Sequence, residues 1–198
     1  MLFGVEAMRI ITGTAKGCRL KAPKGQDTRP TADRIKESLF NILGMKVHGR
    51  HVLDLFAGTG NLGLEALSRG AAHAVFVDRA TAPVIRENAL HTRLDGRAEV
   101  LKSDAFSALA RLAGMGKSFG LVFCDPPYHK GLWERALLFL DASELLSEDG
   151  ILVVEHGVDE DGRMPALRNL VRVRAERYGH TTQVSFFQHQ CYVRGDGS

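Results

Sequence analysis

Short apolar runs alternate with longer amphipathic stretches along the chain from residue 51 onward. The runs predict five β-strands, at residues 51–56, 74–78, 98–101, 121–124 and 151–155. The stretches between them, in which apolar residues recur every three or four positions, predict helices near residues 61–69, 81–93, 105–113 and 131–146. Strands separated by helices are typical of a parallel sheet that is covered on both faces.

Beyond residue 165 this alternation stops, and two further strands are predicted at residues 170–177 and 183–189. The connection through Gly179 leaves no room for a helix, so we expect these two strands to pair in antiparallel fashion. The pattern as a whole predicts a Rossmann-like α/β fold. Its seven-stranded sheet is mostly parallel and ends in an antiparallel hairpin.

The first quarter of the chain has a different pattern and a different charge. Residues 8–12 and 18–22 are β-prone runs on either side of a glycine-rich turn at 13–17, which predicts a small hairpin. Residues 1–50 hold ten Lys and Arg against four Asp and Glu, a net charge of +6, whereas the whole chain carries only +3. This segment is therefore either a binding surface for a polyanion or a basic face in contact with water.

A helix follows a loop at residues 23–30. Thr31 is its predicted N-cap, and Gly44 is predicted to end it. Arg34 and Lys36 lie off the apolar stripe of this helix, so we expect both side chains to face water or a ligand.

Composition narrows the class of protein. The chain has 198 residues, of which 44% are hydrophobic and 25% charged, as in ordinary globular proteins. No apolar run approaches the ~20 residues of a membrane span, and residues 1–7 do not resemble a signal peptide. The three cysteines are scattered and lack metal-ligand spacing. We therefore expect a monomeric cytoplasmic protein with reduced thiols, no membrane association and no metal.

A glycine-rich loop follows the first parallel strand and opens a helix. Gly58, Gly60 and Gly63 match the pattern G-x-G-x-x-G, and Asp78 ends the next strand 20 residues after Gly58. This is also the fingerprint of dinucleotide-binding folds, so an NAD-dependent dehydrogenase is one interpretation. Asp54, however, would repel a pyrophosphate and attract a cationic sulfonium or ammonium group.

Two further acids, Asp78 and Asp104, are suited to bind parts of a nucleoside. Asp78 is placed to bind a ribose diol with both oxygens under either interpretation. Asp104, just after the third strand, is suited to accept a hydrogen bond from an adenine amino group, to cap the following helix, or to do both.

The most informative stretch is Asp125-Pro126-Pro127-Tyr128, directly after the fourth strand. Two prolines stiffen the loop and remove two amide donors, so it presents only carbonyls and a carboxylate beside an aromatic ring. Asp125 and the Pro126 carbonyl can each accept one N–H of an amino group on a planar ring, on which Tyr128 can stack. The alternative is a tight turn with a buried tyrosine.

This arrangement suits methylation of a nucleobase amine. Such a nitrogen is a poor nucleophile because its lone pair is delocalised into the ring. Acceptors that hold both hydrogens restore the lone pair and stabilise the positive charge that develops during attack on a sulfonium methyl.

These motifs resemble those of a known family. Asp-Leu-Phe-Ala-Gly-Thr-Gly at 54–60 with Asp-Pro-Pro-Tyr at 125–128 resembles the class I S-adenosylmethionine-dependent methyltransferases that modify exocyclic amines. The segments at 8–13, 29–41 and 63–70 resemble the RsmD family, from Met8 to about residue 190. The resemblance implies methyl transfer from S-adenosylmethionine to guanine N2 in 16S ribosomal RNA, with rRNA or the assembling small ribosomal subunit as partner.

The resemblance also assigns residues. It implies an upstream extension or tag at 1–7, an RNA-contacting hairpin and helix at 8–44, and a methyltransferase domain at 45–198. The implied cofactor residues are Asp54, Phe56, Ala57, Gly58, Thr59, Gly60, Asp78, Arg79, Asp104, Ala105 and Asp125. The implied catalytic residues are Asp125, Pro126, Pro127 and Tyr128. The implied RNA-binding residues are Arg9, Lys16, Arg19, Lys21, Arg29, Thr31 and Arg34.

Other functions remain open at this point. The same loop occurs in amine methyltransferases that act on DNA adenine or cytosine or on protein glutamine, and a ribosome-assembly RNA-binding factor could retain the fold without turnover. His129 is interpreted as a solvent-facing loop residue. Cys124, Trp133 and His156 are interpreted as structural.

Overall fold

The computed structural model describes residues 8–22 and 30–195. The chain forms two compact units, Met1–Ser103 and Asp104–Ser198. Within the described ranges, no helix is long and apolar enough to cross a membrane.

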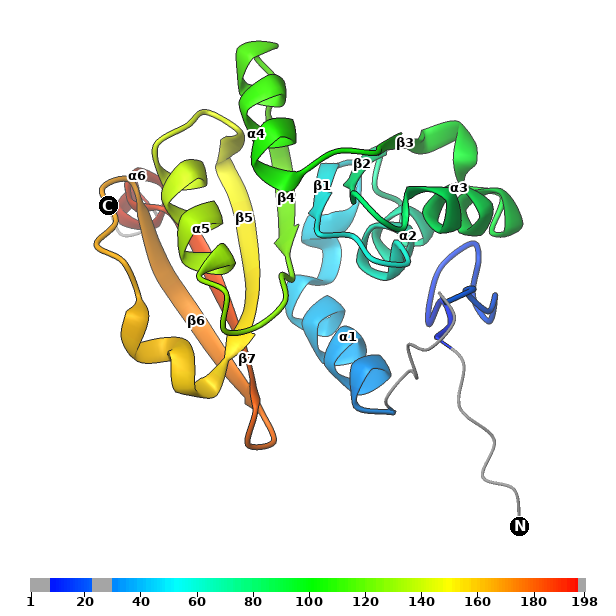
Figure 1. Ribbon diagram of the computed structural model, residues 1–198, viewed down its shortest axis with the longest axis horizontal. Coiled ribbons are helices and arrows are strands. Elements are labelled where there is room, and N and C mark those ends of the chain that lie inside the picture. The colour runs from blue at the N-terminus through cyan, green and yellow to red at the C-terminus, as the bar shows by residue number, and fades with distance from the viewer. Residues whose placement is uncertain (1–7, 23–29, 196–198) are drawn as a thin grey trace. The chain divides into compact units, whose positions relative to one another are not determined.

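The first unit is a three-stranded parallel sheet with its helices (Figure 1). Its elements are α1 (Pro30–Leu43), η1 (Gly44–Val47), β1 (His51–Leu55), α2 (Asn61–Ser68), β2 (His73–Val77), α3 (Ala82–His91), η2 (Asp95–Arg97) and β3 (Ala98–Leu101). β2 pairs with both β1 and β3, with His51 opposite His73 and Ala74 opposite Ala98. The last four residues of β1 and of β2 are all buried, as expected for parallel strands that are covered on both faces.

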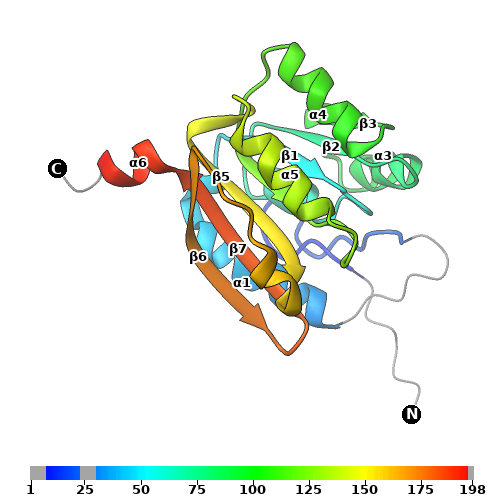
Figure 2. The same cartoon turned by 60° about the vertical axis from the view of Figure 1, so that its left-hand side comes forward.

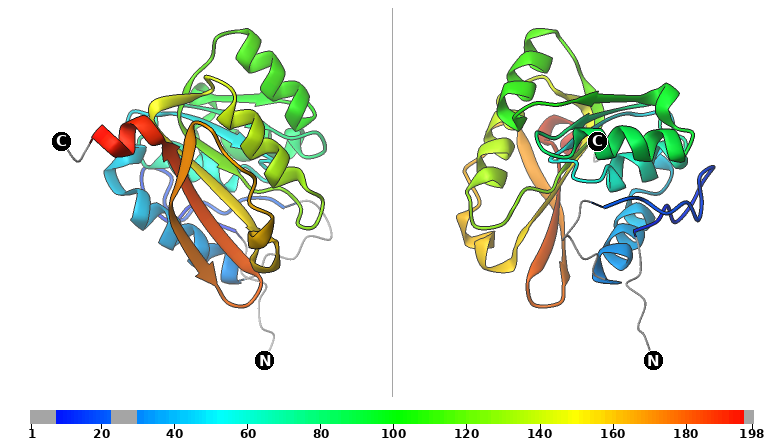
Figure 3. Two further views of the ribbon diagram at one scale, coloured as in Figure 1. Left: turned by 90° about the vertical axis from the view of Figure 1, so that its left-hand side faces the viewer. Right: turned by 45° about the vertical axis from the view of Figure 1, so that its right-hand side comes forward.

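The second unit contains the remaining four strands. Its elements are α4 (Ala105–Gly114), β4 (Phe119–Cys124), α5 (Leu132–Asp141), β5 (Leu146–Gly157), η3 (Val158–Arg163), β6 (Leu170–Tyr178), β7 (Thr182–His189) and α6 (Gln190–Gly195). β4 and β5 are parallel, and β7 pairs in antiparallel fashion with both β5 and β6. Figure 2 and the left view of Figure 3 show β7 between β5 and β6, with α5 along β5.

The strand order is β3-β2-β1-β4-β5-β7-β6. This confirms the predicted α/β fold with a seven-stranded, mostly parallel sheet and a C-terminal antiparallel hairpin. All seven strands were expected from the sequence, with ends that differ by a few residues.

The predicted N-terminal hairpin is not formed as two strands. Residues 8–20 contain a single antiparallel bridge, between Arg9 and Arg19. Backbone hydrogen bonds run from the Leu20 N–H to the Met8 carbonyl and from the Ile10 N–H to the Cys18 carbonyl, but beyond Ile10 the N–H groups of Ile11 and Thr12 donate to the Glu65 carboxylate on α2. The right view of Figure 3 shows this dark blue segment beside the helices of its unit.

The helix α1 differs from the prediction in two respects. It begins at Pro30, so Thr31 lies within the helix and is not its N-cap. Lys36 is buried, with only 1% of its side chain exposed, whereas Arg34 is exposed as expected. Lys36 is buried because it finds polar partners on other elements, a possibility that the amphipathic pattern of one helix does not reveal.

The helix predicted at 131–146 is too long. The helix α5 ends at Asp141, and Leu146 already pairs with Phe119 of β4. The Phe119 N–H also donates to the Leu145 carbonyl, so this segment joins the sheet and cannot extend the helix. The short elements η3 and α6 were not predicted.

Candidate functional site

The glycine turn, residues 57–63, connects β1 to α2 and requires glycine at two positions for different reasons. Gly60 is the N-cap of α2 and has a left-handed φ of 81°. At Gly63, a Cβ would lie 2.3 Å from Cε1 of Phe76 on β2, so any side chain would displace the ring. The turn therefore packs closely on β2.

Asp54 lies beneath this turn and is only 2% exposed. Its Oδ2 accepts a hydrogen bond of 2.8 Å from the Gly63 N–H near the start of α2. Burial raises the pKa of Asp54 from 3.8 to about 7; the Gly63 hydrogen bond opposes this rise, and the nearby Asp78 charge adds to it. Asp54 therefore titrates near neutral pH, and a cation bound close to it would favour the charged form.

Asp78 connects the glycine turn to the start of α3. Its Oδ2 accepts from the Gly58 N–H at 3.0 Å, and its Oδ1 accepts from the Ala80 and Thr81 N–H groups at 2.8 and 2.9 Å. A carboxylate offers about four acceptor positions, so three are taken within the protein. About one acceptor position, at Oδ2, is left for a ligand; that Asp78 binds a ribose diol stays a prediction.

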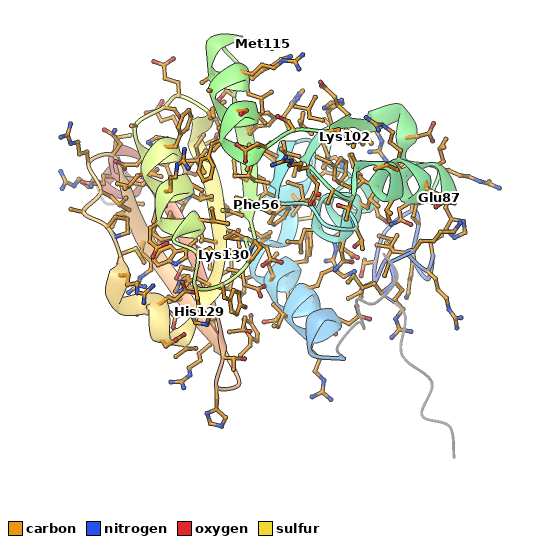
Figure 4. All side chains as sticks on the ribbon, in the orientation of Figure 1. Phe56, Glu87, Lys102, Met115, His129 and Lys130 are labelled. Atoms are coloured by element: carbon orange, nitrogen blue, oxygen red, sulfur yellow. The ribbon has the colours of Figure 1, made fainter. Side chains whose placement is uncertain are left out.

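Phe56 follows β1 with a left-handed φ of 62°, a conformation that is strained for an aromatic residue. Its side chain is half-buried, and Figure 4 shows it beyond the end of β1. Of the other predicted cofactor residues in this unit, Ala57 and Thr59 are buried and Arg79 is exposed. Strain of this kind concentrates at functional sites, so the backbone at Phe56 is itself an indication of a site.

Asp104 caps α4, as one of its two predicted roles requires. Its Oδ1 accepts from the Phe106 and Ser107 N–H groups at 3.0 and 3.2 Å. The side chain of Asp104 is exposed, and Ala105 is buried in the first turn of the helix.

The loop after β4 alternates between exposed and buried residues. Asp125 and Pro127 are exposed, Pro126 is buried and Tyr128 is half-buried. The Tyr128 hydroxyl donates a hydrogen bond of 2.6 Å to Glu155 Oε1 at the end of β5, and it lies 3.1 Å from Thr182 Oγ1 at the start of β7. Burial, with the Glu155 carboxylate, raises the pKa of Tyr128, and burial also raises the pKa of Glu155.

His129, the next residue of the loop after β4, is also held by a hydrogen bond. His129 has a left-handed φ of 60°, and its N–H donates to Glu160 Oε1 at 3.1 Å. Glu160 is fully buried, and its Oε2 accepts from the Gly157 N–H at 3.0 Å. The His129 ring is 59% exposed, as predicted, and Figure 4 shows it near Lys130 on this loop.

Sequence reasoning missed Glu155, Glu160 and Thr182. Each contacts the loop from 27 to 54 positions further along the chain. The one local indication was Glu155, an acid at the end of an otherwise apolar predicted strand. A carboxylate is costly to bury without a hydrogen-bond partner.

The basic residues predicted to bind RNA are exposed wherever the structure describes their side chains. These are Arg9, Lys16, Arg19, Lys21 and Arg34. Arg9 lies 3.6 Å from Asp33, and Lys21 pairs with Glu87 on α3. Arg29 lies outside the described residues, as does the side chain of Thr31.

The structural interpretations of Trp133, His156 and Cys124 are confirmed. Trp133 is 1% exposed and stacks on His156, with ring centroids 4.6 Å apart. His156 is fully buried and bonds to Ser185 Oγ at 3.0 Å. Cys124 is 1% exposed. Among the described residues, no three His, Cys, Asp or Glu side chains are grouped as a metal site would require.

Comparison with known proteins identifies relatives over nearly the whole chain. The family model described as "Conserved hypothetical protein 95" matches residues 8–188. "Putative rRNA methyltransferase YlbH" of Bacillus subtilis is 42% identical over 177 residues, which cover 88% of this chain and 95% of that protein. "Ribosomal RNA small subunit methyltransferase D" of Escherichia coli K12 is 40% identical over 158 residues, which cover 79% of this chain and 78% of that protein.

A solved structure, "Putative methyltransferase yhhF from Escherichia coli", is similar with a TM-score of 0.80 and 36% identity. The match covers 91% of this chain and 97% of that one. The chain therefore belongs to the family described as conserved hypothetical protein 95, and the resemblance of its motifs to RsmD-type class I methyltransferases is confirmed.

Proposed function

We propose that this protein transfers a methyl group from S-adenosylmethionine to the exocyclic N2 of a guanine in 16S ribosomal RNA. The names of the two relatives described above support an rRNA substrate. The choice of guanine N2 rests on the resemblance to the RsmD family and on the chemistry of the loop after β4.

The turn after β1 fits a nucleoside donor that carries a positive charge. Phe56 to Gly60 would line the cofactor site, and the fourth acceptor position of Asp78 would take one ribose hydroxyl. Asp54 is only 2% exposed, so we assign it an action through its charge on a sulfonium or ammonium group and not through a direct hydrogen bond. Asp104 and Arg79, both exposed, are the residues we assign to the adenine end of the ligand.

The loop after β4 would hold the acceptor base. Asp125 and the Pro126 carbonyl accept the two N–H bonds of the amine, and Tyr128 stacks on the ring. S-adenosylmethionine supplies a methyl group bound to a positively charged sulfur. The guanine nitrogen forms a bond to this methyl as the methyl–sulfur bond breaks and its electron pair returns to sulfur. The nitrogen then gives its extra proton to Asp125 or to water.

The single observation that carries the proposal is the anchoring of Tyr128. An exposed carboxylate, Asp125, comes directly after a fully buried strand, and three residues later the tyrosine hydroxyl is bonded to Glu155. The hydroxyl therefore has an acidic partner, at 2.6 Å, at the end of the neighbouring strand β5. The anchor fixes the ring while the carboxylate remains accessible, which suits a base-binding loop.

The RNA would be bound through its phosphates by the exposed cations of residues 8–22 and α1. A base in a structured RNA must leave its stack to reach a methyltransferase loop, at a cost of a few kcal/mol. Contacts between these cations and the backbone would offset part of that cost.

The test is mass mapping of methylated guanines in 16S rRNA from cells with and without the gene. We expect one N2-methylguanine to disappear on deletion and to return with the wild-type gene. The exposed variant Glu148→Gln should also restore it, whereas Asp125→Ala should not, although it should still bind S-adenosylhomocysteine. If every rRNA guanine stays modified, or the lost methyl group lies in DNA or protein, the proposal is wrong. Restoration by Asp125→Ala would show that Asp125 does not have the catalytic role assigned to it.

A further inference from the structure

A network of buried charges in the first unit has no part in the proposed chemistry. Glu65 on α2 is fully buried, and the side chain of Lys36 on α1 is 1% exposed. The Lys36 Nζ lies 3.3 Å from Glu65 Oε2, and the Arg69 Nε lies 2.8 Å from Glu65 Oε1. Buried charges are costly unless they are paired, so this group requires an explanation.

The same glutamate holds residues 8–22, here called the N-terminal segment, against α2. Glu65 accepts hydrogen bonds from the Ile11 N–H at 2.8 Å and from the Thr12 N–H at 3.0 Å. With Lys36 and Arg69, these donors take about all of its four acceptor positions. Contact continues at Gly13, where a Cβ would lie 1.9 Å from the Ser68 carbonyl oxygen. The segment is therefore fitted to the surface of α2.

Two polar bridges lead from this segment to the glycine turn. Lys36 Nζ donates to the Arg9 carbonyl and, at 2.6 Å, to Oδ1 of Asn61, the first residue of α2. Asn88, fully buried on α3, donates through Nδ2 to the Thr59 carbonyl at 2.9 Å and to the Lys21 carbonyl at 3.0 Å. Both ends of the segment are thus linked to the turn, through one intervening side chain each.

We propose that Lys36 and Asn88 are positioning residues that couple the N-terminal segment to the glycine turn, so that docking of the segment and cofactor binding stabilise each other. The inference rests on the proposed function for the identity of the ligand. Its physical basis is preorganisation, because Thr59 and Asn61 are held in place by groups that are themselves held by the segment. Linkage makes the effect reciprocal, so the bound ligand must also stabilise the docked segment.

The coupling has a consequence for the substrate. The N-terminal segment carries the exposed cations Lys16 and Arg19, to which the proposed function assigns the binding of RNA phosphates. RNA that binds to the docked segment would therefore raise the affinity for the cofactor, and cofactor would raise the affinity for RNA, by the same factor.

The test needs only S-adenosylhomocysteine and no RNA. Lys36→Met would leave Glu65 with a single counter-charge and could prevent folding, so Asn61→Ala is the better variant. It cuts the bridge at the turn and leaves the Lys36–Glu65–Arg69 group intact. We expect about a tenfold weaker binding in calorimetry, the effect of one hydrogen bond of about 1.4 kcal/mol. Glu87→Gln removes only the exposed pair with Lys21 and should bind as the wild type does.

Hydrogen exchange at the amides of Ile11 and Thr12 gives the decisive measurement, since both donate to Glu65. The ligand should slow their exchange in the wild type and in Glu87→Gln but not in Asn61→Ala. Unchanged affinity in Asn61→Ala, or no protection in a wild type that binds the ligand, would overturn the coupling alone. Weaker binding with protection retained would make Asn61 a direct ligand contact and would also overturn it. A wild type that binds no ligand would overturn the proposed function as well.

Discussion

Tyr128 and Glu155 form a hydrogen bond of 2.6 Å between the loop after β4 and the end of β5. The bond restrains the tyrosine ring at its hydroxyl end and leaves the ring itself half-buried. Tyr128→Phe keeps the ring and removes the restraint, so we expect single-turnover methyl transfer to slow by about tenfold, the effect of one lost hydrogen bond. Binding of S-adenosylhomocysteine should not change.

Three further variants separate the effect of the hydrogen-bond restraint from that of ring stacking. Tyr128→Ala also removes the ring and should slow transfer far more than Tyr128→Phe. Glu155→Gln keeps an oxygen that can accept the bond, so it should lose less activity than Glu155→Ala. Wild-type rates in Tyr128→Phe would show that the restraint has no role in the reaction.

Asp78 provides the second prediction. The Asp78→Asn variant keeps one acceptor oxygen for the Ala80 and Thr81 N–H groups, but its amide nitrogen would face the Gly58 N–H as a second donor. Both the turn and the position for a ribose hydroxyl would be disturbed. We expect the affinity for S-adenosylhomocysteine to fall by about 10- to 100-fold, as for loss of a charged hydrogen bond. Affinity for RNA without cofactor should stay within about twofold, and a parallel loss there would point to general unfolding.

The seven strands and most of the helices from residue 51 onward were predictable because apolar runs and helical periodicity mark them, whereas the short elements η3 and α6 carry no such pattern. The N-terminal strands were not, because the Ile11 and Thr12 amides bond to a carboxylate more than fifty positions away. For a similar reason the prediction that Lys36 faces water or a ligand was wrong. A charge off an apolar stripe normally faces water, but here Glu65 and Asn61 offer a buried alternative.

The sequence predicted the motifs of the candidate site but not the residues that hold these motifs in place. The glycine turn and the Asp-Pro-Pro-Tyr loop each follow a strand, and such positions at strand ends can be read from the sequence. The groups that hold Tyr128 and His129 come from β5, η3 and β7, and no local pattern connects them to the loop. No sequence pattern distinguishes a buried glutamate, such as Glu160, from an exposed one.

Asp54 makes stability depend on pH. Its pKa is about 7 in the folded protein, against 3.8 for an ordinary exposed aspartate, so the folded state holds an extra proton between these limits. The stabilisation is complete below pH 3.8 and is lost as the pH rises through about 7, by ~4 kcal/mol in total. Asp54→Asn keeps an oxygen for the Gly63 N–H but does not titrate. In urea unfolding, the variant should therefore gain stability relative to the wild type between about pH 5 and pH 8. A constant difference between the two proteins would show that Asp54 is already ionised at the acidic end of this range.

Salt dependence distinguishes phosphate contacts from an unused basic face. Each phosphate contact of a bound cation contributes about 0.7 to 0.9 to the slope of log affinity against log salt. Lys16→Ala, Arg19→Ala and Arg34→Ala should each lower that slope by about this amount for unmodified 16S rRNA, and Lys117→Ala, exposed in the second unit, should not. Filter binding between about 50 and 200 mM salt gives the slopes. Wild-type slopes in all four variants would mean that Lys16, Arg19 and Arg34 do not touch the RNA, and the guanine would then have to be recognised without a phosphate anchor on the N-terminal segment or α1.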